Sequence, residues 1–201
     1  MMFCRPFAMA LLASTVVGCA SVQEVTSLRS VEFRLDRISD VRLAGVDLSY
    51  VRSSSDLAVS DGARVASALV GGELPLSFQL HLLAENPRRN SVAARLVRLQ
   101  WTLFLDGTET ISGQIAPSYK LLPGEPTTVP IEISLDLLEY YERTGQELME
   151  LATSLTGVGG VPKRIAVRAV PTINTTFGAI TYPEPITIVS GSVGRPLVAR
   201  N

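Results

Sequence analysis

Hydrophobic and polar side chains alternate along several short segments of the chain. Val31, Phe33 and Leu35 are separated by charged residues, and such a period of two is typical of a strand with one buried face. This first segment predicts one long or bent edge strand over residues 31–50. Alternating or apolar segments follow at residues 74–84, 92–105, 110–116, 128–133, 163–170 and 181–189. Seven short segments separated by turn signals favour an antiparallel β-sandwich over a fold of alternating strands and helices.

Turn residues mark where the central strands end. Asn86 and Pro87 follow the strand over 74–84, and Asp106–Gly107 follows the strand over 92–105. The second pair is the strongest hairpin signal in the chain. Since Asn, Pro, Asp and Gly are ordinary turn residues, we expect a structural role for all four positions. The face of the 92–105 strand that turns inward is predicted to carry Val97, Leu99, Trp101, Leu103 and Leu105.

Helical spacing replaces the alternation over residues 136–155. Apolar residues recur there every three or four positions, which predicts one inserted amphipathic helix. Asp136 and Glu139 fit a capping box at its start, and Gly145 inside the pattern leaves room for a kink or a break. Core packing is the expected role of the apolar stripe, with a partner surface and lipid contact as alternatives. A second, shorter helix is expected over 61–70.

The N-terminus has the layout of a signal peptide. Arg5 is its only charge, and residues 7–17 are apolar. This stretch of about 11 residues is shorter than the roughly 20 that a membrane-spanning helix needs. The run ends in Val16-Val17-Gly18-Cys19, which resembles the lipobox of bacterial lipoproteins. By that resemblance, cleavage falls between Gly18 and Cys19, and the Cys19 thiol becomes acylated. An ordinary secretory signal, or a buried apolar N-terminal helix, is the alternative.

The chain therefore divides into four expected parts. These are a signal peptide (1–18), a lipidated tether (19–30), the sandwich domain (31–190) and a flexible tail (191–201). Ala20 follows the cysteine where an acidic residue would otherwise favour retention at the inner membrane. By resemblance to the sorting pattern of Gram-negative lipoproteins, we expect an outer-membrane anchor with the domain facing the periplasm.

Charge and composition exclude several kinds of function. The chain has 18 Lys and Arg against 19 Asp and Glu, so it has no basic field for a nucleic-acid backbone. Two cysteines and one histidine cannot complete a zinc site without carboxylates, and we expect neither a metal nor a cofactor. Nucleophile and phosphate-loop motifs are absent from the sequence. His81 is expected to be a solvated strand residue, so no catalytic residue is assigned and the chain is predicted not to be an enzyme.

Several short motifs occur in a fixed order over residues 76–113. An alternating strand ends in Glu85-Asn86-Pro87, then Gln100-Trp101-Thr102-Leu103-Phe104-Leu105-Asp106-Gly107 follows, and then Ser112-Gly113. In this order the chain resembles the type 2 late embryogenesis abundant (LEA) proteins and their WHy (water stress and hypersensitive response) domain, over about residues 31–189. Arg88 stands where the family usually has Asn, and Trp101 where Tyr is common. The resemblance implies a fibronectin type III-like, immunoglobulin-like sandwich and no catalytic residues.

Two functions remain open from the sequence. The first is a lipid-anchored envelope protein, without enzymatic activity, that protects against desiccation or envelope stress. The alternative is a periplasmic module that binds a protein partner or an apolar ligand, in a cavity lined by Leu137, Tyr141 and Leu148. Arg88 and Arg89 are expected in a solvated turn, with lipid headgroups or an acidic partner as the other option.

Overall fold

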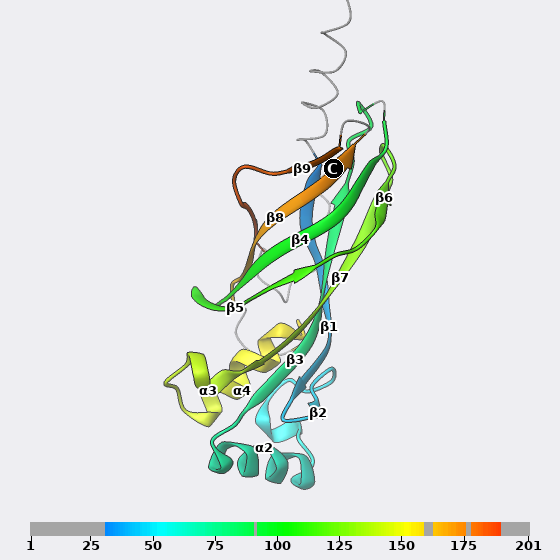
Figure 1. Cartoon of the computed structure of the whole chain (residues 1–201). Coiled ribbons are helices and arrows are strands. Elements are labelled where there is room, and N and C mark those ends of the chain that lie inside the picture. The colour runs from blue at the N-terminus through cyan, green and yellow to red at the C-terminus, as the bar shows by residue number, and fades with distance from the viewer. Residues whose placement is uncertain (1–30, 91, 159–162, 176–177, 190–201) are drawn as a thin grey trace, which may run out of the picture.

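Two antiparallel sheets pack face to face in the computed structural model, which describes residues 31–90, 92–158, 163–175 and 178–189 (Figure 1). One sheet has four strands in the order β2–β1–β3–β7, and the other has six, with β10–β8–β4–β5 as its path, β6 paired to β4 and β9 paired to β8. The strands are β1 (Glu32–Leu43), β2 (Val46–Asp47), β3 (Pro75–Glu85), β4 (Ala94–Leu105), β5 (Thr108–Ile115), β6 (Tyr119–Leu121), β7 (Pro126–Asp136), β8 (Ile165–Thr175), β9 (Gly178–Thr181) and β10 (Ile186–Val189). The predicted β-sandwich is confirmed.

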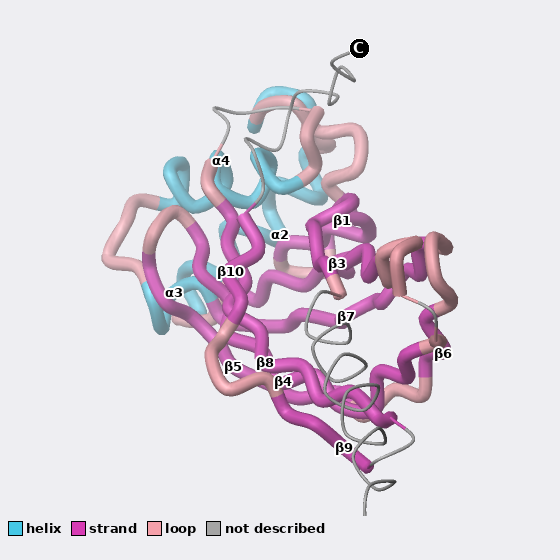
Figure 2. Tube along the Cα trace, turned by 90° about the horizontal axis from the view of Figure 1, so that it is seen from above, coloured by secondary structure: helices cyan, strands magenta, loops and turns pink. Residues whose placement is uncertain are grey.

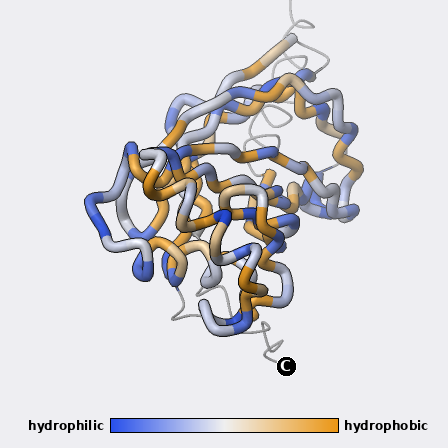
Figure 3. The backbone as a smooth tube through the Cα atoms, turned by 90° about the horizontal axis from the view of Figure 1, so that it is seen from below, coloured by the Kyte–Doolittle hydropathy of each residue, from blue (hydrophilic) through white to orange (hydrophobic). Residues whose placement is uncertain are grey.

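The hydrophobic core lies between the two sheets. Alternate side chains of each central strand point inward, and Figure 3 shows hydrophobic and hydrophilic positions alternating along the chain. β3 contributes Leu76, Phe78, Leu80, Leu82 and Ala84, all at most 3% exposed. β7, beside β3 in the same sheet, extends this face with Val129, Ile131 and Ile133. β4 and β8 of the facing sheet cover it with Leu99, Leu103, Leu105, Ile165, Val167 and Ala169. Burial of so many aliphatic groups, each worth about 1.5–3 kcal/mol, is what holds the sheets together.

The first predicted strand is long and bent, as expected, but it ends at Leu43 and does not run to residue 50. The chain turns at Ala44 and Gly45, both with positive φ, and returns as the short edge strand β2. β1 pairs with β3 along its length, while β2 covers only its last two residues. Register shifts occur between Leu35 and Arg37 and between Ser39 and Arg42. Asp40 has a φ of 55° there. These bulges bend the strand, because an extra residue on one side of a ladder increases the local twist.

The structure differs from the predicted strands in three further places. The segment expected as one strand over 181–189 forms the separate strands β9 and β10. β6 was not predicted. In β4 a register shift lies between Leu96 and Arg98, so Leu96 is buried and Val97 only half-buried. The predicted inward position of Val97 is therefore wrong, because a bulge reverses the facing of every residue before it.

The predicted helix over 136–155 is interrupted. It forms α3 (Leu137–Tyr140) and α4 (Gly145–Leu155). Asp136 caps α3, but the capping box expected with Glu139 is absent from it, and a capping box instead joins Thr144 to Glu147 at the start of α4. The second predicted helix is present as α2 (Val59–Gly71), preceded by the short η1 (Ser54–Asp56).

The sandwich has a helical end and a loop end. α2, α3 and α4 gather at one end and the β3–β4 loop lies at the other, as Figure 1 shows. Figure 2, seen from above, shows the three helices on the same side of the molecule. β1 connects the two ends, because Glu32 pairs with Glu85 and Leu43 pairs with Leu76. Within the described residues, no helix is long and apolar enough to cross a membrane.

Candidate functional site

The described chain begins at the loop end of the sandwich. Val31 is buried at 5% exposure, and Glu32 pairs with Glu85 immediately before Asn86. The predicted cleavage and lipidation positions, Gly18 and Cys19, lie outside the described residues. The segment that contains them joins the domain at this end, beside the β3–β4 loop.

Asn86 holds three parts of the loop end together. Its side chain is fully buried, and its Nδ2 donates to the carbonyl oxygens of Val92 at 3.1 Å and Leu121 at 3.0 Å. The Asn90 amide donates to its Oδ1, and the Gly124 amide donates to its backbone oxygen. Pro87, half-buried, continues from it into the turn. These contacts give Asn86 a structural role rather than a place on a ligand surface.

Asp106 and Gly107 form the two-residue turn between β4 and β5. Their φ angles are 51° and 86°, the combination that a type I′ hairpin requires. The carboxylate oxygen Oδ2 of Asp106 accepts from both terminal nitrogens of Arg143 at 3.1 Å and from Lys163 Nζ at 3.4 Å. The turn is therefore tied to the α3–α4 connection and to the approach to β8. Sequence analysis missed this ion cluster, whose members are far apart in the chain.

Tyr141 anchors the interrupted helical segment to the core. Its hydroxyl donates to the Leu105 carbonyl at 2.7 Å, and the Arg143 guanidinium lies 4.9 Å from its ring centre. Burial raises the pKa of the Tyr141 hydroxyl to about 12. Leu137 and Leu148 are fully buried beside it in the same core. The apolar stripe thus packs against the sheets, which is the first of the three roles considered for it.

His81 is not the solvated residue that its strand position predicted. It points away from Phe78 and Leu80, yet it is only 7% exposed, because Arg37 and Pro130 flank it on the neighbouring strands. Its Nε2 lies 2.9 Å from Ser39 Oγ. Desolvation lowers the pKa of His81, and the charge of Arg37 lowers it further, while Asp36 and Asp40 oppose the shift.

The hydrogen bond between Ser39 and His81 runs in the opposite direction from that between a catalytic serine and its base. Ser39 Oγ donates its proton to the Asp40 carboxylate at 2.8 Å, so the His81 ring must donate to Ser39 through Nε2. A catalytic serine instead donates its proton to the histidine. Nδ1 of His81 is buried with no hydrogen-bond partner among the described residues. Ser39 and His81 therefore form a structural contact between β1 and β3.

A hollow of mixed lining, with both polar side chains and the apolar Val170 and Pro185, lies on the outer face of the six-stranded sheet. Its volume is about 530 Å³, and its floor includes Gln100, Thr102, Ser112 and Gln114. The Thr102 and Ser112 hydroxyls lie 2.8 Å apart, and the Gln100 amide donates to Gln114 at 3.4 Å. Among the described residues, no three His, Cys, Asp or Glu side chains lie close enough to hold a metal ion.

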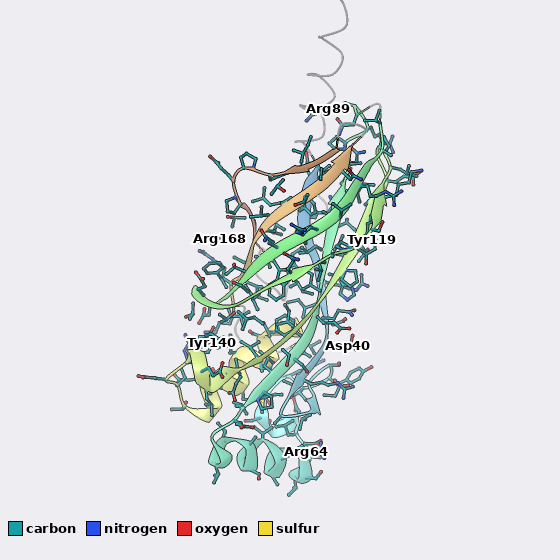
Figure 4. The ribbon with its side chains drawn as sticks, in the orientation of Figure 1. Asp40, Arg64, Arg89, Tyr119, Tyr140 and Arg168 are labelled. Carbon is teal, nitrogen blue, oxygen red and sulfur yellow. The ribbon has the colours of Figure 1, made fainter. Side chains whose placement is uncertain are left out.

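Charge is distributed unevenly between the two ends. Exposed cations gather at the loop end, where Arg88, Arg89, Arg95 and Lys120 lie on the β3–β4 loop, β4 and β6. Figure 4 shows Arg89 at this end and Arg64 of α2 at the other. The helical end is acidic: its segments 46–74 and 136–157 contain Asp47, Asp56, Asp61, Glu73, Asp136, Glu139, Glu142, Glu147 and Glu150 against Arg52, Arg64 and Arg143.

No family model and no curated protein matches this chain. A protein from Archaeoglobus fulgidus is similar in its crystal structure over 57% of this chain and 82% of its own, with 17% identity and a TM-score of 0.36. The solution structure of a candidate late embryogenesis abundant protein is similar over 85% and 77%, with 13% identity and a TM-score of 0.38. The X-ray structure of a Northeast Structural Genomics Consortium target is similar over 86% and 95%, with 9% identity and a TM-score of 0.39.

Proposed function

We propose that the chain is a lipid-anchored protein of the cell envelope, without enzymatic activity, whose sandwich domain is held at the membrane by an acylated Cys19. The observation that carries this proposal is the apolar run over residues 7–17 that ends in Gly18-Cys19. A single acyl chain binds a membrane only reversibly, whereas the several chains of a bacterial lipoprotein anchor it stably. The sorting pattern at Ala20 points to the outer membrane and a domain facing the periplasm.

The described domain is suited to such a tether. Its hydrophobic core is built from residues between Val31 and Ile188, and the chain joins it at one end of the sandwich. A tether of residues 19–30 spans at most about 40 Å when fully extended. The loop end of the domain would therefore stay within about 40 Å of the membrane surface.

For the role of the domain, we propose protection against desiccation or envelope stress, as the resemblance to type 2 LEA proteins suggests. The motif residues that carry this resemblance serve the fold: Asn86 organises the loop end and Asp106–Gly107 forms a hairpin. A protective role that uses the whole surface needs no pocket. The proposed partner is therefore the membrane lipid through Cys19, with no metal, cofactor or nucleic acid.

Replacement of the anchor cysteine tests the first part of the proposal. Cys19→Ala is expected to move the protein from the membrane fraction to the soluble fraction and to abolish labelling with radioactive palmitate. Cys4→Ala is the matched control, because Cys4 lies in the segment that cleavage removes. Unchanged fractionation and labelling of Cys19→Ala would refute the anchor.

Drying experiments test the second part. A desiccation-sensitive enzyme is dried with the protein or with an inert globular protein at equal mass, and its activity is measured after rehydration. Clearly greater recovery with this protein supports the protective role. Equal recovery contradicts it and favours the alternative, a periplasmic module that binds an apolar ligand or a partner. Because Leu137, Tyr141 and Leu148 are packed in the core, that module would have to use another surface.

A further inference from the structure

Four exposed cations at the loop end of the sandwich form no ion pair with any residue that the structure describes. Arg88 and Arg89 lie on the β3–β4 loop, and Arg95 and Lys120 lie on neighbouring strands. Within the described ranges, the ion pairs involve Arg34, Arg37, Arg143 and Lys163 and none of these four. The Arg95 guanidinium donates a hydrogen bond to Ser118 Oγ at 3.0 Å and contacts no carboxylate of the described residues. The guanidinium and ammonium groups are therefore free to meet an external anion.

Two of the cations are placed where the fold itself does not favour them. Arg95 and Lys120 are direct cross-strand partners in the β4–β6 pair, and like charges in such positions repel each other. The acidic groups nearby form no ion pair with them. Glu85 is bound to Arg34 at 3.1 Å, and Glu32 and Glu125 are exposed without an ion pair to a described residue. The four cations outnumber these two free carboxylates, so the loop end keeps a positive charge.

The position of these cations matches the place where the tether joins the domain. β1 starts beside Glu85 at the loop end and runs to the helical end, a length of about 36 Å for its residues at the usual strand rise. That separation is several times the Debye length of about 8 Å at physiological salt. A charged surface at the loop end would therefore attract the cations without repelling the acidic helices.

We infer that the surface formed by Arg88, Arg89, Arg95 and Lys120 binds anionic phospholipid headgroups and holds the sandwich upright, with its helical end away from the membrane. The occupant is the membrane to which Cys19 attaches, so the inference rests on the proposed anchor. Arg supplies paired N–H donors for phosphate oxygens, and Lys a compact charge. The acidic helices would then face the aqueous compartment.

The orientation is measured with the full chain, purified from membranes and reconstituted into vesicles. One set of vesicles contains phosphatidylcholine alone, and the other contains phosphatidylcholine and phosphatidylglycerol in equal parts. A fluorophore is attached to a single introduced cysteine, either Ala93→Cys at the loop end or Ser60→Cys on α2, both exposed positions. Lipids with nitroxide headgroups quench a fluorophore that lies at the membrane surface.

We expect quenching at position 93 to be at least about threefold stronger with phosphatidylglycerol, and quenching at position 60 to stay weak. Each Lys or Arg near an anionic surface strengthens binding by about fivefold. Arg89→Gln with Lys120→Gln should therefore reduce quenching at position 93 markedly, towards the phosphatidylcholine level, although Arg88 and Arg95 remain. Arg52→Gln with Arg64→Gln removes the same charge from exposed residues at the helical end and should change nothing.

Quenching at position 93 that is independent of phosphatidylglycerol would overturn the inference and assign the cations to an acidic protein partner. So would an unchanged signal in the folded Arg89→Gln, Lys120→Gln protein, with folding checked by circular dichroism. Raising the salt concentration of the wild-type sample, which should weaken quenching, tests the same point without a variant. Failure of the anchor is detected separately. In the chain without an introduced cysteine, an unacylated Cys19 would react with the fluorophore, whereas an acylated Cys19 would not. If Cys19 is unacylated, flotation of this unlabelled chain with the two vesicle types tests whether the cationic surface alone binds phosphatidylglycerol.

Discussion

The indole ring of Trp101 in β4 lies over Gly113, its direct partner in β5, so a Cβ at position 113 would overlap with the ring atom Cζ2. Trp101 is 8% exposed and closes the core beside the edge strand. We expect Gly113→Ala to destabilise the protein by about 1–3 kcal/mol, the usual cost of overpacking. Urea unfolding measures this change.

Two controls test the cause of that loss. Gly62→Ala, on α2 where a Cβ would meet open space, should stabilise the protein by up to about 1 kcal/mol because alanine favours a helix. In a Trp101→Leu background, Gly113→Ala should lower the free energy of unfolding much less than it does in the wild-type protein. An equal cost in both backgrounds would contradict the steric explanation.

Asn86→Ala should be strongly destabilising. The substitution removes the donor to the carbonyl oxygens of Val92 and Leu121 and the acceptor for the Asn90 amide. Leaving buried polar groups without partners costs about 1–3 kcal/mol each, so we expect a total loss of at least about 2 kcal/mol in urea unfolding. Asn174→Ala, at an exposed position of β8, should change stability by less than about 0.5 kcal/mol. Similar effects of the two substitutions would show that the Asn86 network does not stabilise the loop end.

Tyr141→Phe should weaken the protein at neutral pH and matter less at high pH. The substitution removes the hydrogen bond to the Leu105 carbonyl, which costs about 1 kcal/mol. Because burial raises the pKa of Tyr141 from 10.0 to about 12, the unfolded chain loses the proton at a lower pH than the folded protein. The contribution of the Tyr141 hydroxyl to the free energy of unfolding is therefore complete below pH 10 and is lost as the pH rises towards 12.

The measurement is urea unfolding of both proteins at pH 8 and at several values above pH 10. The difference between wild type and Tyr141→Phe should shrink or reverse over that range. Tyr50→Phe is the control for the substitution itself, since Tyr50 is 90% exposed and its replacement should change stability at pH 8 by less than about 0.5 kcal/mol. Parallel stability curves for wild type and Tyr141→Phe would contradict the pKa shift.

Local patterns predicted the central strands well because each of these strands buries one face. β3 and β4 alternate as the sequence indicates, and Asp106–Gly107 needs positive φ at both positions, which few other pairs supply. The bulge beside Val97 was not predictable, because it depends on how β4 pairs with β8. Alternation alone carries no information on such a shift.

Tertiary contacts determined the features that sequence analysis missed. The helical pattern continues through Tyr141, but the hydroxyl of Tyr141 binds the Leu105 carbonyl in β4. The next helix, α4, begins only at Gly145, with Thr144 as its N-cap. The spacing of Thr144 and Glu147 does signal this second start, as a capping box. For the loop end, the sequence showed Arg88 and Arg89 as neighbours, but it did not show that Arg95 lies opposite Lys120, which the β4–β6 pairing creates.

His81 provides a titration that is simple to assign, because it is the chain's single histidine. Burial and the nearby Arg37 lower its pKa below the usual 6.5, against the opposing charges of Asp36 and Asp40. As the pH falls, His81 therefore takes up a proton at a higher pH in the unfolded chain than in the folded protein. Stability from the neutral ring is complete above pH 6.5 and is lost as the pH falls towards the folded-state pKa.

NMR titration of the His81 ring protons should therefore give a midpoint below 6.5. Arg37→Gln should move the midpoint upward without restoring 6.5, since burial is the larger cause and persists in this variant. Arg52→Gln removes a similar charge from the helical end and should leave the midpoint unchanged. A midpoint at or above 6.5 in the wild-type protein would mean that the ring is solvated. The contact between His81 and Ser39 would then not hold β1 against β3 in solution.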